Sequence, residues 1–256
     1  MEPIEIERLE GGVVVLRMQH GKANALDLPL CYALRQRLAE HAGQDVRAFV
    51  LTGTGRIFSA GVDLRQLVES DPSYAAEFLP AMGAAMYALF AVEKPVVAAV
   101  NGHAVAGGCI LACAADHRVM AAEGGRIGVA ELAVGVPFPT VALEIVRYAC
   151  ASHRFQRVVL GAGLYEPEEA VELGLVDEVV PADHVLPRAL EEARALAEID
   201  PKVFAVTKRE LRRPALSRIA ADQADHDPIV LALWREESTR ERVRGYVERT
   251  IGGKKA

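Results

Sequence analysis

Two glycine-centred turns, residues 58–64 and 101–109, contain the residues of this chain whose types and spacing could do chemistry. Each turn follows an apolar run that predicts a strand and leads into a segment that predicts a helix. Because glycine lets the main chain approach a ligand closely, two such junctions can direct backbone N–H groups to one point. Two converging N–H groups stabilise an oxyanion, such as the enolate of a thioester. The turns therefore favour acyl-thioester chemistry.

The elements that must position these turns alternate between strands and helices in the first half of the chain. In chain order the pattern predicts strands at residues 4–7, 13–16, 47–52, 95–100 and 117–120, and helices at 28–41 and 74–92. Asp27 is the expected N-cap of the first of these helices. The repeated pattern predicts an α/β fold in which ββα units stack and helices cover one side.

From about residue 139 the pattern is almost wholly helical. The predicted helices are 140–150, 153–161, 166–174, 182–198, 201–212 and 217–249, with one isolated strand at 176–180. Leu231, Leu233 and Trp234 give the last helix a partly apolar surface. We expect that surface to pack against a neighbouring subunit in preference to the core of its own chain.

Length and charge restrict the class of protein. The 256 residues are enough for one large domain, or for a domain with a helical extension. A formal charge of −6 without a dense basic stripe argues against a nucleic-acid-binding protein. The apolar run 96–115 is interrupted by Asn, Gly and His residues, so it predicts a buried strand, turn and helix and no membrane span. The charged N-terminus does not read as a signal peptide, so we expect a cytoplasmic protein.

Neither cysteine nor histidine spacing indicates a metal site. Cys31, Cys109, Cys113 and Cys150 form no CxxC pair, and an apolar helix contains the middle two. Buried thiols are therefore expected at these positions. The histidines lack HExxH-type spacing, so no metal is predicted.

Four segments occur in an order that resembles the enoyl-CoA hydratase/isomerase (crotonase) family. They are GKANAL at 21–26, FSAGVDL at 58–64, NGHAVAGG at 101–108 and YEPEEAVELGLVDEVV at 165–180. The resemblance implies a crotonase-like ββα spiral core over residues 1–195 and a helical oligomerisation region over 196–256. It implies a homotrimer or a dimer of trimers. It also implies an acyl-CoA thioester substrate and no cofactor, because CoA enters as part of that substrate.

The resemblance also assigns roles to residues. The backbone N–H groups of Val62 and Gly107 would form an oxyanion hole for the thioester carbonyl, and Asp63 would tie down the turn by hydrogen bonding. The residues that the resemblance places at the substrate and its CoA are Lys22, Ala23, Ala25, Ala60, Gly61, Val62, Asp63, Leu64, Val105, Gly107, Gly108, Ile110, Glu131, Pro137 and Phe138.

The acid/base residues distinguish the reactions within this family. Hydratases of the family carry two glutamates, and the positions that correspond here are Ile110 and Glu131. Addition of water needs one group to activate water and another to deliver a proton, so Ile110 argues against efficient hydration. A shift of a double bond from the 3- to the 2-position needs one carboxylate. An apolar Ile110 would keep water from the intermediate and raise the pKa of that carboxylate.

The single glutamate is similar to the pattern of the mitochondrial-type Δ3,Δ2-enoyl-CoA isomerase branch. Ala106-Gly107-Gly108-Cys109 and Pro137-Phe138 add to that similarity. The chain departs from the branch at Ala130, which lacks a side-chain amide, and from the family at His20, where proline is common. The sequence therefore predicts an isomerase acting on 3-enoyl-CoA through Glu131, with weak or absent hydratase activity.

Other interpretations stay open at this point. Glu131 could be structural, which would leave a non-catalytic acyl-CoA-binding protein. A hydratase or another reaction of the family, such as thioester hydrolysis, would need a second carboxylate, and the acidic residues that folding could supply are Asp71, Glu77, Asp116 and Glu144. His103 and Asp116 are interpreted as structural, Ser59 lacks a nucleophile elbow, and Cys109 lacks a base. Residues 67–90, including Met82, Met86, Tyr87 and Phe90, are candidates for the acyl pocket or for plain core.

Overall fold

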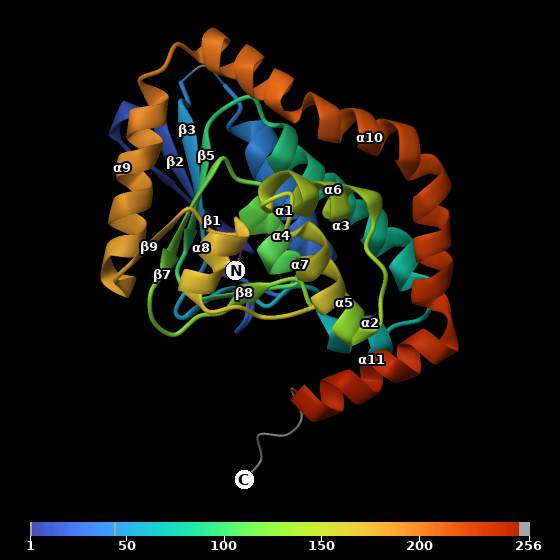
Figure 1. Ribbon diagram of the computed structural model, residues 1–256. Helices are drawn as coiled ribbons and strands as arrows, with labels where there is room; N and C mark the ends of the chain where they lie inside the picture. Colours follow the sequence, from blue (N-terminus) through green and yellow to red (C-terminus); the bar gives the residue numbers. More distant parts are fainter. Residues whose placement is uncertain (1, 44, 251–256) are drawn as a thin grey trace.

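A six-stranded sheet forms the centre of the computed structural model, which describes residues 2–43 and 45–250 (Figure 1). The first two strands are antiparallel to each other, and all later neighbours are parallel. Because strands β3 and β5 are buried on both faces, their sequences are continuous apolar runs. In spatial order the strands are β1 (Ile4–Arg8), β2 (Val13–Met18), β3 (Ala48–Thr52), β5 (Val96–Val100), β7 (His117–Ala121) and β9 (Glu178–Val180).

A second, smaller sheet carries the segments next to the glycine turns. Its parallel strands are β4 (Ile57–Ser59), β6 (His103–Val105) and β8 (Ile127–Gly128), in that order. From β3 to β8, successive strands alternate between the large and the small sheet, and helices follow each pair. These helices are α2 (Leu64–Glu69) and α3 (Tyr74–Ala91), then α4 (Gly107–Cys113), then α5 (Glu131–Val134). The predicted stack of ββα units is confirmed, although strands of two or three residues left no periodic signal.

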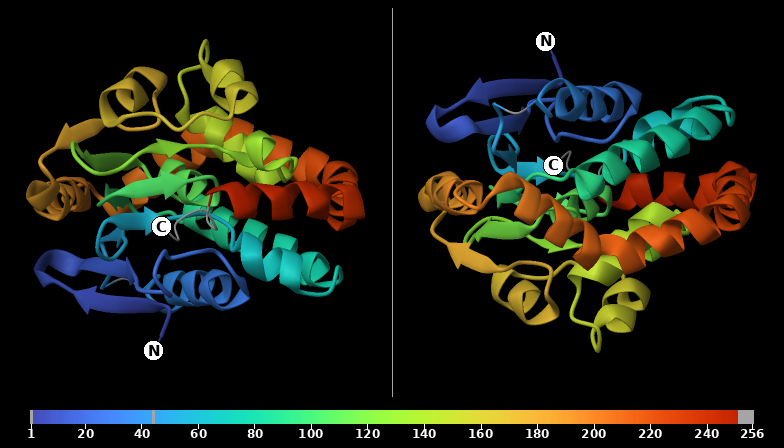
Figure 2. Two further views of the ribbon diagram at one scale, coloured as in Figure 1. Left: turned by 90° about the horizontal axis from the view of Figure 1, so that it is seen from below. Right: turned by 90° about the horizontal axis from the view of Figure 1, so that it is seen from above.

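Helices cover both faces of the large sheet, so the expectation of cover on one side is wrong. Helix α9 (Val185–Ala197) packs on the face that carries Val13, Val15, Ala48 and Val50. Helices α1 (Leu28–Glu40), α3, α4 and α6 (Thr140–Ala149) pack on the opposite face. Figures 1 and 2 show α9 apart from the other helices. Alternate residues of a strand point to opposite faces, and here both sets are apolar.

The remaining elements in the middle of the chain follow the predictions closely. Helices α7 (Phe155–Gly161) and α8 (Pro167–Leu173) lie within the predicted ranges, and α9 is preceded by the 3-10 turn η2 (Ala182–His184). A second 3-10 turn, η1 (Glu10–Gly12), joins β1 to β2. Within the described ranges, no helix combines the length and the apolar composition needed to cross a membrane.

The C-terminal region differs from the prediction in where its helices break. Helix α10 (Pro201–Arg235) is continuous through Pro214, and the chain breaks at Glu236 before α11 (Glu237–Thr250). The predicted interruption between 212 and 217 is therefore wrong. Arg212 and Ala215 are buried on either side of Pro214, so packing against the body of the protein offsets the cost of the proline.

The last turns of α10 pack on the core of the same chain. Trp234 is 2% exposed and donates a hydrogen bond from Nε1 to the Pro137 carbonyl at 3.1 Å. Leu231 packs partly buried against the same core, while Leu233 is 36% exposed. The preference for a neighbouring subunit is thus wrong for Trp234. The predicted domain boundary at residue 195 falls inside α9 and stays a prediction. The last residues of the predicted oligomerisation region, 251–256, lie outside the described ranges.

Candidate functional site

The two glycine turns are in direct contact, which only residues without a Cβ allow. Gly61 has a φ of 78°, and a Cβ on it would lie 2.5 Å from the Val105 carbonyl oxygen and 3.0 Å from the Gly107 nitrogen. A Cβ on Gly108 would lie 2.3 Å from the Ser59 carbonyl oxygen. Since β4 pairs with β6 in parallel, both turns leave the small sheet at the same edge. The convergence that the sequence predicted is therefore present.

Backbone hydrogen bonds fix the first turn on the segment 21–26. The Leu26 N–H donates to Gly61 O at 2.8 Å, and the Asp63 N–H donates to Leu26 O at 2.9 Å. The Val62 N–H between them has no partner in the described part of the chain, and neither has the Gly107 N–H at the start of α4. The first N–H groups of a helix have no partner within the helix. Two N–H donors are thus available where the turns meet.

A cavity of about 610 Å³ opens beside the turns. It brings together nine of the residues that the sequence predicted for the site. These nine are Lys22, Ala23, Ala25, Ala60, Val62, Asp63, Leu64, Val105 and Glu131. Ten further residues line the same cavity without having been predicted, namely His20, Gly21, Arg65, Ala106, Ala130, Val134, Val136, Trp234, Tyr246 and Thr250.

Six predicted site residues do not line this cavity. Gly61, Gly107 and Gly108 form the backbone where the turns touch, and Ile110 is 2% exposed inside α4. Pro137 and Phe138 lie against α10, because their carbonyl oxygens bond to Trp234 Nε1 and to His226 Nε2, each at 3.1 Å. These two residues hold α10, and their contact with a ligand stays a prediction.

Glu131 is the buried carboxylate of the cavity. It is the first residue of α5, and its side chain is 7% exposed at the cavity wall. Burial raises the pKa of Glu131 to about 7, while the backbone N–H groups of Glu131 and Ala130 act in the opposite direction. Oε2 has no hydrogen-bond partner in the described part of the chain. A carboxyl group with this pKa can accept or donate a proton near neutral pH.

Asp63 is the other carboxylate at the cavity among the described residues. Its Oδ1 accepts a hydrogen bond from the Gln66 N–H at 3.0 Å and so caps α2, as the predicted structural role requires. The acidic residues considered for a second catalytic group lie elsewhere. Asp116 pairs with Lys208 and Arg212, and Glu144 pairs with Arg147 and Arg218.

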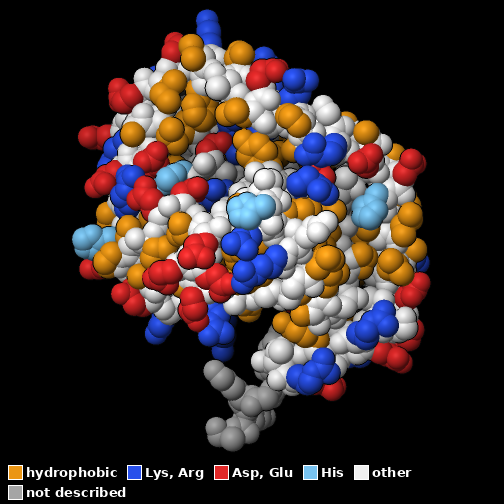
Figure 3. Space-filling view, in the orientation of Figure 1, with side chains coloured by type: hydrophobic (Ala, Val, Ile, Leu, Met, Phe, Trp, Pro, Cys, Tyr) orange, Lys and Arg blue, Asp and Glu red, His pale blue; other side chains and the backbone are white. Residues whose placement is uncertain are grey.

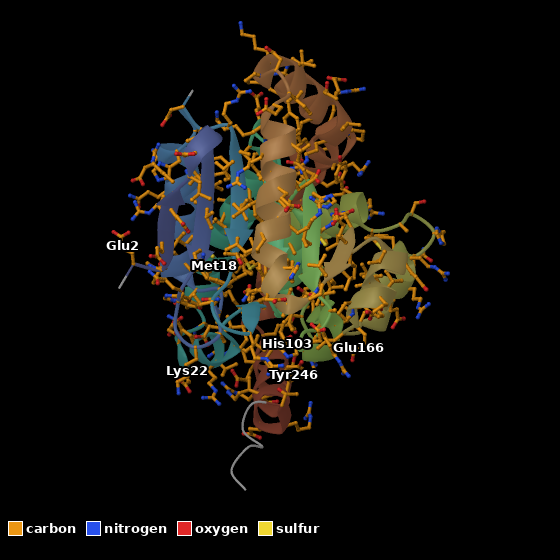
Figure 4. All side chains as sticks on the ribbon, turned by 90° about the vertical axis from the view of Figure 1, so that its left-hand side faces the viewer. Glu2, Met18, Lys22, His103, Glu166 and Tyr246 are labelled. Carbon is orange, nitrogen blue, oxygen red and sulfur yellow. The ribbon has the colours of Figure 1, made fainter. Side chains whose placement is uncertain are left out.

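His20 lines the cavity together with Lys22, although no role was predicted for it. Its Nε2 is 2.6 Å from Asp27 Oδ2. Asp27 Oδ1 also accepts from the Leu30 N–H, which confirms the predicted N-cap of α1. Lys22 and Tyr246 lie at the same end of the molecule (Figure 4). The one sequence signal for His20 was that the resemblance led us to expect proline at this position.

The other nucleophilic side chains near the turns are engaged in structure. The ring of His103 accepts from the Arg126 N–H at 3.1 Å, and the Ser59 hydroxyl donates to Asn24 O at 2.7 Å. Cys109 is buried 4.0 Å from the Cys113 sulfur, and its pKa is raised by that neighbour and by burial. None of them is a lining residue of the cavity. The interpretation of His103 as structural agrees with this geometry, and Ser59 and Cys109 are likewise engaged in contacts within the fold.

The far wall of the cavity comes from the C-terminal helices and not from residues 67–90. Trp234 of α10 and Tyr246 and Thr250 of α11 line it. Met86 and Phe90 are fully buried core, and Tyr87 is 42% exposed on the surface. Of the two interpretations left open for residues 67–90, plain core agrees with these positions, and contact with an acyl chain stays a prediction. Trp234, Tyr246 and Thr250 follow the glycine turns by more than a hundred residues, so no local pattern could link them.

One group of side chains in the described ranges has the ligand types of a metal site. His117, Glu178 and Glu192 place one ligand atom each within 4.8 Å of one another. However, the Arg188 guanidinium donates to Glu178 at 2.6 Å and to Glu192 at 2.9 Å. This cluster is an ion-pair network between β7, β9 and α9, and its residues do not line the cavity.

Comparison with known proteins places these features in one family. Residues 8–251 match the family model described as enoyl-CoA hydratase/isomerase. A putative enoyl-CoA hydratase of Thermus thermophilus is 38% identical over 199 residues, which are 76% of each chain. The 2,3-dehydroadipyl-CoA hydratase of Escherichia coli is 29% identical over 252 residues, which are 97% of each chain.

The crystal structure of human mitochondrial delta3-delta2-enoyl-CoA isomerase has the same fold. It superposes with a TM-score of 0.94 at 25% identity and covers 99% of this chain and 100% of that one. The α/β fold with a ββα core and a helical C-terminal region is thereby confirmed, as is the resemblance to the isomerase branch. Hydratases and isomerases both occur among the relatives.

Proposed function

The chain belongs to the enoyl-CoA hydratase/isomerase family, and we propose that it converts 3-enoyl-CoA into trans-2-enoyl-CoA. The observation that supports this reaction is the state of Glu131. It is a buried carboxyl group with a pKa of about 7, one of its oxygens has no partner among the described residues, and it lines the same cavity as Val62. The other carboxylate at the cavity, Asp63, is engaged in capping α2. One free carboxylate suits a proton shuttle within the substrate.

In the proposed mechanism, one proton passes from the substrate to Glu131 and back to the substrate. No other covalent bond to the enzyme forms or breaks. The Glu131 carboxylate removes a proton from the α-carbon of the 3-enoyl thioester. The electron pair spreads over the γ-carbon and the thioester oxygen, and the N–H groups of Val62 and Gly107 donate to that oxygen. The Glu131 carboxyl group then returns the proton to the γ-carbon, which leaves the double bond between the α- and β-carbons. The reaction needs no cofactor beyond the CoA of its substrate.

The two ends of the cavity suit the two parts of an acyl-CoA. Lys22, Ala23 and Ala25 would border the CoA, with the ammonium group of Lys22 available to phosphate oxygens. Val134, Val136 and the rings of Trp234 and Tyr246 would surround the acyl chain. Ile110, buried next to the turn, would help to keep water away from the dienolate.

Hydration is the second candidate, because two of the relatives are named as hydratases. It would need a second group to handle the proton of water, and Ile110 stands where hydratases of the family carry a glutamate. A non-catalytic acyl-CoA-binding protein is a third candidate. The Oε2 atom of Glu131, which has no hydrogen-bond partner in the described ranges, argues against a purely structural role.

A parallel assay of the purified protein with a 3-enoyl-CoA and with a trans-2-enoyl-CoA in water tests these candidates. We expect conversion of the 3-enoyl substrate and much slower hydration. Hydration at a comparable rate would contradict the proposal and would require a second acid/base group. Binding of both thioesters with no reaction would favour the binding protein.

The Glu131→Gln variant tests the role of the carboxylate. We expect kcat to fall by about two to four decades, because the amide cannot accept the proton, while affinity for acyl-CoA is retained. Steady-state kinetics and calorimetric binding measure the two effects. Glu168→Gln, on the exposed surface of α8, is the matched control and should behave as the wild type. Full activity of Glu131→Gln would show that another group is the base.

We also propose that the protein is cytoplasmic and forms a homotrimer or a dimer of trimers. The outer surface of α10 supports an assembly, because Val203, Val206, Leu211 and Ile229 are each more than half exposed there. Apolar side chains at this density on one helix favour contact with another subunit. The mass of the protein in solution, measured by sedimentation, tests the assembly, and a monomer would contradict it.

A further inference from the structure

Arg240 is a buried cation of α11 whose partners are backbone carbonyls of a distant helix. The residue is 5% exposed. Its Nη1 donates to Leu67 O at 3.0 Å, and its Nη2 donates to Val68 O at 2.9 Å and to Ser70 O at 2.8 Å. The nearest carboxylate, on Glu237, is 3.9 Å away and 62% exposed. The charge of Arg240 is therefore directed mainly at main-chain oxygens.

These three carbonyls are the C-terminal end of α2. The last C=O groups of a helix have no partner within it, and they carry the negative end of the helix dipole. Ser70 ends the helix, and its N–H donates back to Gln66 O at 2.9 Å. Arg240 thus supplies the C-cap of α2 from a position 170 residues further along the chain.

The other end of α2 is the turn that carries the Val62 N–H. Asp63 caps α2 through the Gln66 N–H, and Val62 precedes it directly. A helix of six residues is about 9 Å long and moves as one unit. A shift of the capped end of α2 therefore reaches the oxyanion turn.

The helix that carries Arg240 also builds the far wall of the cavity. Tyr246 and Thr250 follow Arg240 on α11 and line the cavity. Figure 1 shows α11 beside α2 and α5, and Figure 3 shows α11 as a lobe at the lower right with basic side chains on its outer surface. The hydrogen bonds of Arg240 join this lobe to α2.

We propose that Arg240 is a positioning residue that couples the wall formed by α11 to the oxyanion turn through α2. The inference rests on the proposed function, since it assigns Val62 to the reacting thioester. Arg240 touches no substrate atom in this scheme. Arg240 fixes the position of the Val62 N–H group relative to the cavity wall formed by α11. Removal of its side chain should therefore affect both the turnover and the affinity for acyl-CoA.

The variants Arg240→Met and Arg240→Lys test the coupling. Methionine keeps the length and removes the charge, and a single ammonium group cannot bridge three carbonyls as the planar guanidinium does. Arg244→Met is the matched control on the same helix, because Arg244 is 40% exposed and pairs with Glu237. Three quantities are measured for each variant: amide hydrogen exchange, affinity for butyryl-CoA as an unreactive thioester, and kcat and KM with a 3-enoyl-CoA.

We expect faster exchange in both α2 and α11, butyryl-CoA affinity weakened by about tenfold, and kcat lowered by a similar factor. The control should match the wild type. Faster exchange confined to α11, with affinity and kcat unchanged, would reduce Arg240 to a structural residue and overturn the inference. Unchanged exchange would do the same. If Arg240→Met does not fold, the same three measurements on Arg240→Lys test the coupling.

The proposed function can fail separately from this inference. A wild-type protein that binds butyryl-CoA but converts no 3-enoyl-CoA would contradict the isomerase. Exchange and affinity of the Arg240 variants would then still show whether α2 and α11 are coupled.

Discussion

At the scale of single residues, the site depends on how burial changes the chemistry of Glu131. An exposed glutamate is ionised at neutral pH and is a weak base. Removal of the side chain from water raises its pKa to about 7, because the charged form loses solvation. Among the described residues, no positive side chain offsets this effect of burial on the pKa. The Glu131 carboxylate is thus a stronger base near neutral pH than the carboxylate of an exposed glutamate.

The pH dependence of the proposed isomerase reaction follows from the raised pKa of Glu131. Proton removal needs ionised Glu131, so kcat/KM should fall by about one decade per pH unit below pH 7 and level off above it. Initial rates with a 3-enoyl-CoA, with circular dichroism to show that the fold is intact, measure the profile. A profile that is flat from about pH 5.5 to about pH 8 would mean that Glu131 keeps an ordinary carboxyl pKa or is not the base.

At the scale of elements, the contact between the two glycine turns sets the positions of the N–H donors. Strand β4 delivers the first turn and β6 the second, and their parallel pairing brings both to one edge. Gly61 then faces Val105 O at a distance that no Cβ could occupy. The site therefore depends on backbone approach as much as on any side chain.

Gly61→Ala tests this contact. The added Cβ would meet the Val105 oxygen, and the φ of 78° is unfavourable for alanine. We expect the free energy of unfolding to fall by about 2–4 kcal/mol and kcat/KM to fall at least tenfold in the protein that folds. Urea denaturation and kinetics measure these effects.

Gly55→Ala is the control for Gly61→Ala. Gly55 also has a positive φ, of 62°, but no atom lies within 4 Å of the position of its added Cβ. The free energy of unfolding of the Gly55→Ala variant should fall by only about 1 kcal/mol, and its activity should be unchanged. Equal losses of stability and activity in both variants would contradict this expectation. They would show that the positive φ of the glycine, and not the contact between the turns, causes the effect.

At the scale of the whole molecule, α10 must be held along the body so that Trp234 and α11 reach the cavity. A buried ion cluster attaches it: Asp116 pairs with Lys208 and Arg212 of α10, each at 2.6 Å. Both cations are nearly inaccessible to solvent, and burial lowers the pKa of Lys208 to about 8. Arg212 also donates to Phe90 O and stacks on the Phe90 ring. The cluster joins the C-terminal helices to the core between β5 and β7.

Asp116→Asn should destabilise the protein by about 3–5 kcal/mol, because it leaves two buried cations without their anion. Glu93→Gln is the matched control, since the pair of Glu93 with Arg209 of α10 is 58% exposed on both sides. That change should cost less than about 1 kcal/mol. Chemical denaturation measures both values. A loss below about 1 kcal/mol for Asp116→Asn would mean that apolar packing alone holds α10.

The sequence by itself determined the features that depend on neighbours in the chain. The cap Asp27 and the glycines of both turns could be read from it, because turn geometry and helix starts are set by a few adjacent residues. The position of Glu131 came from the resemblance to the family. The ββα order followed from the same local periodicity. The continuity of α10 through Pro214 did not, since packing of residues on both sides overrides the local signal.

Only the tertiary structure decided which of these features act together. Pairing of β4 with β6 brings the Val62 and Gly107 turns into contact, and the return of α10 and α11 supplies Trp234, Tyr246 and the Arg240 cap. The position of Glu131 was visible in the sequence and an apolar neighbour suggested a raised pKa, but the value of about 7 requires the surrounding elements to exclude water. Solvation depends on all the atoms around a group, and most of those atoms belong to segments far away in the chain.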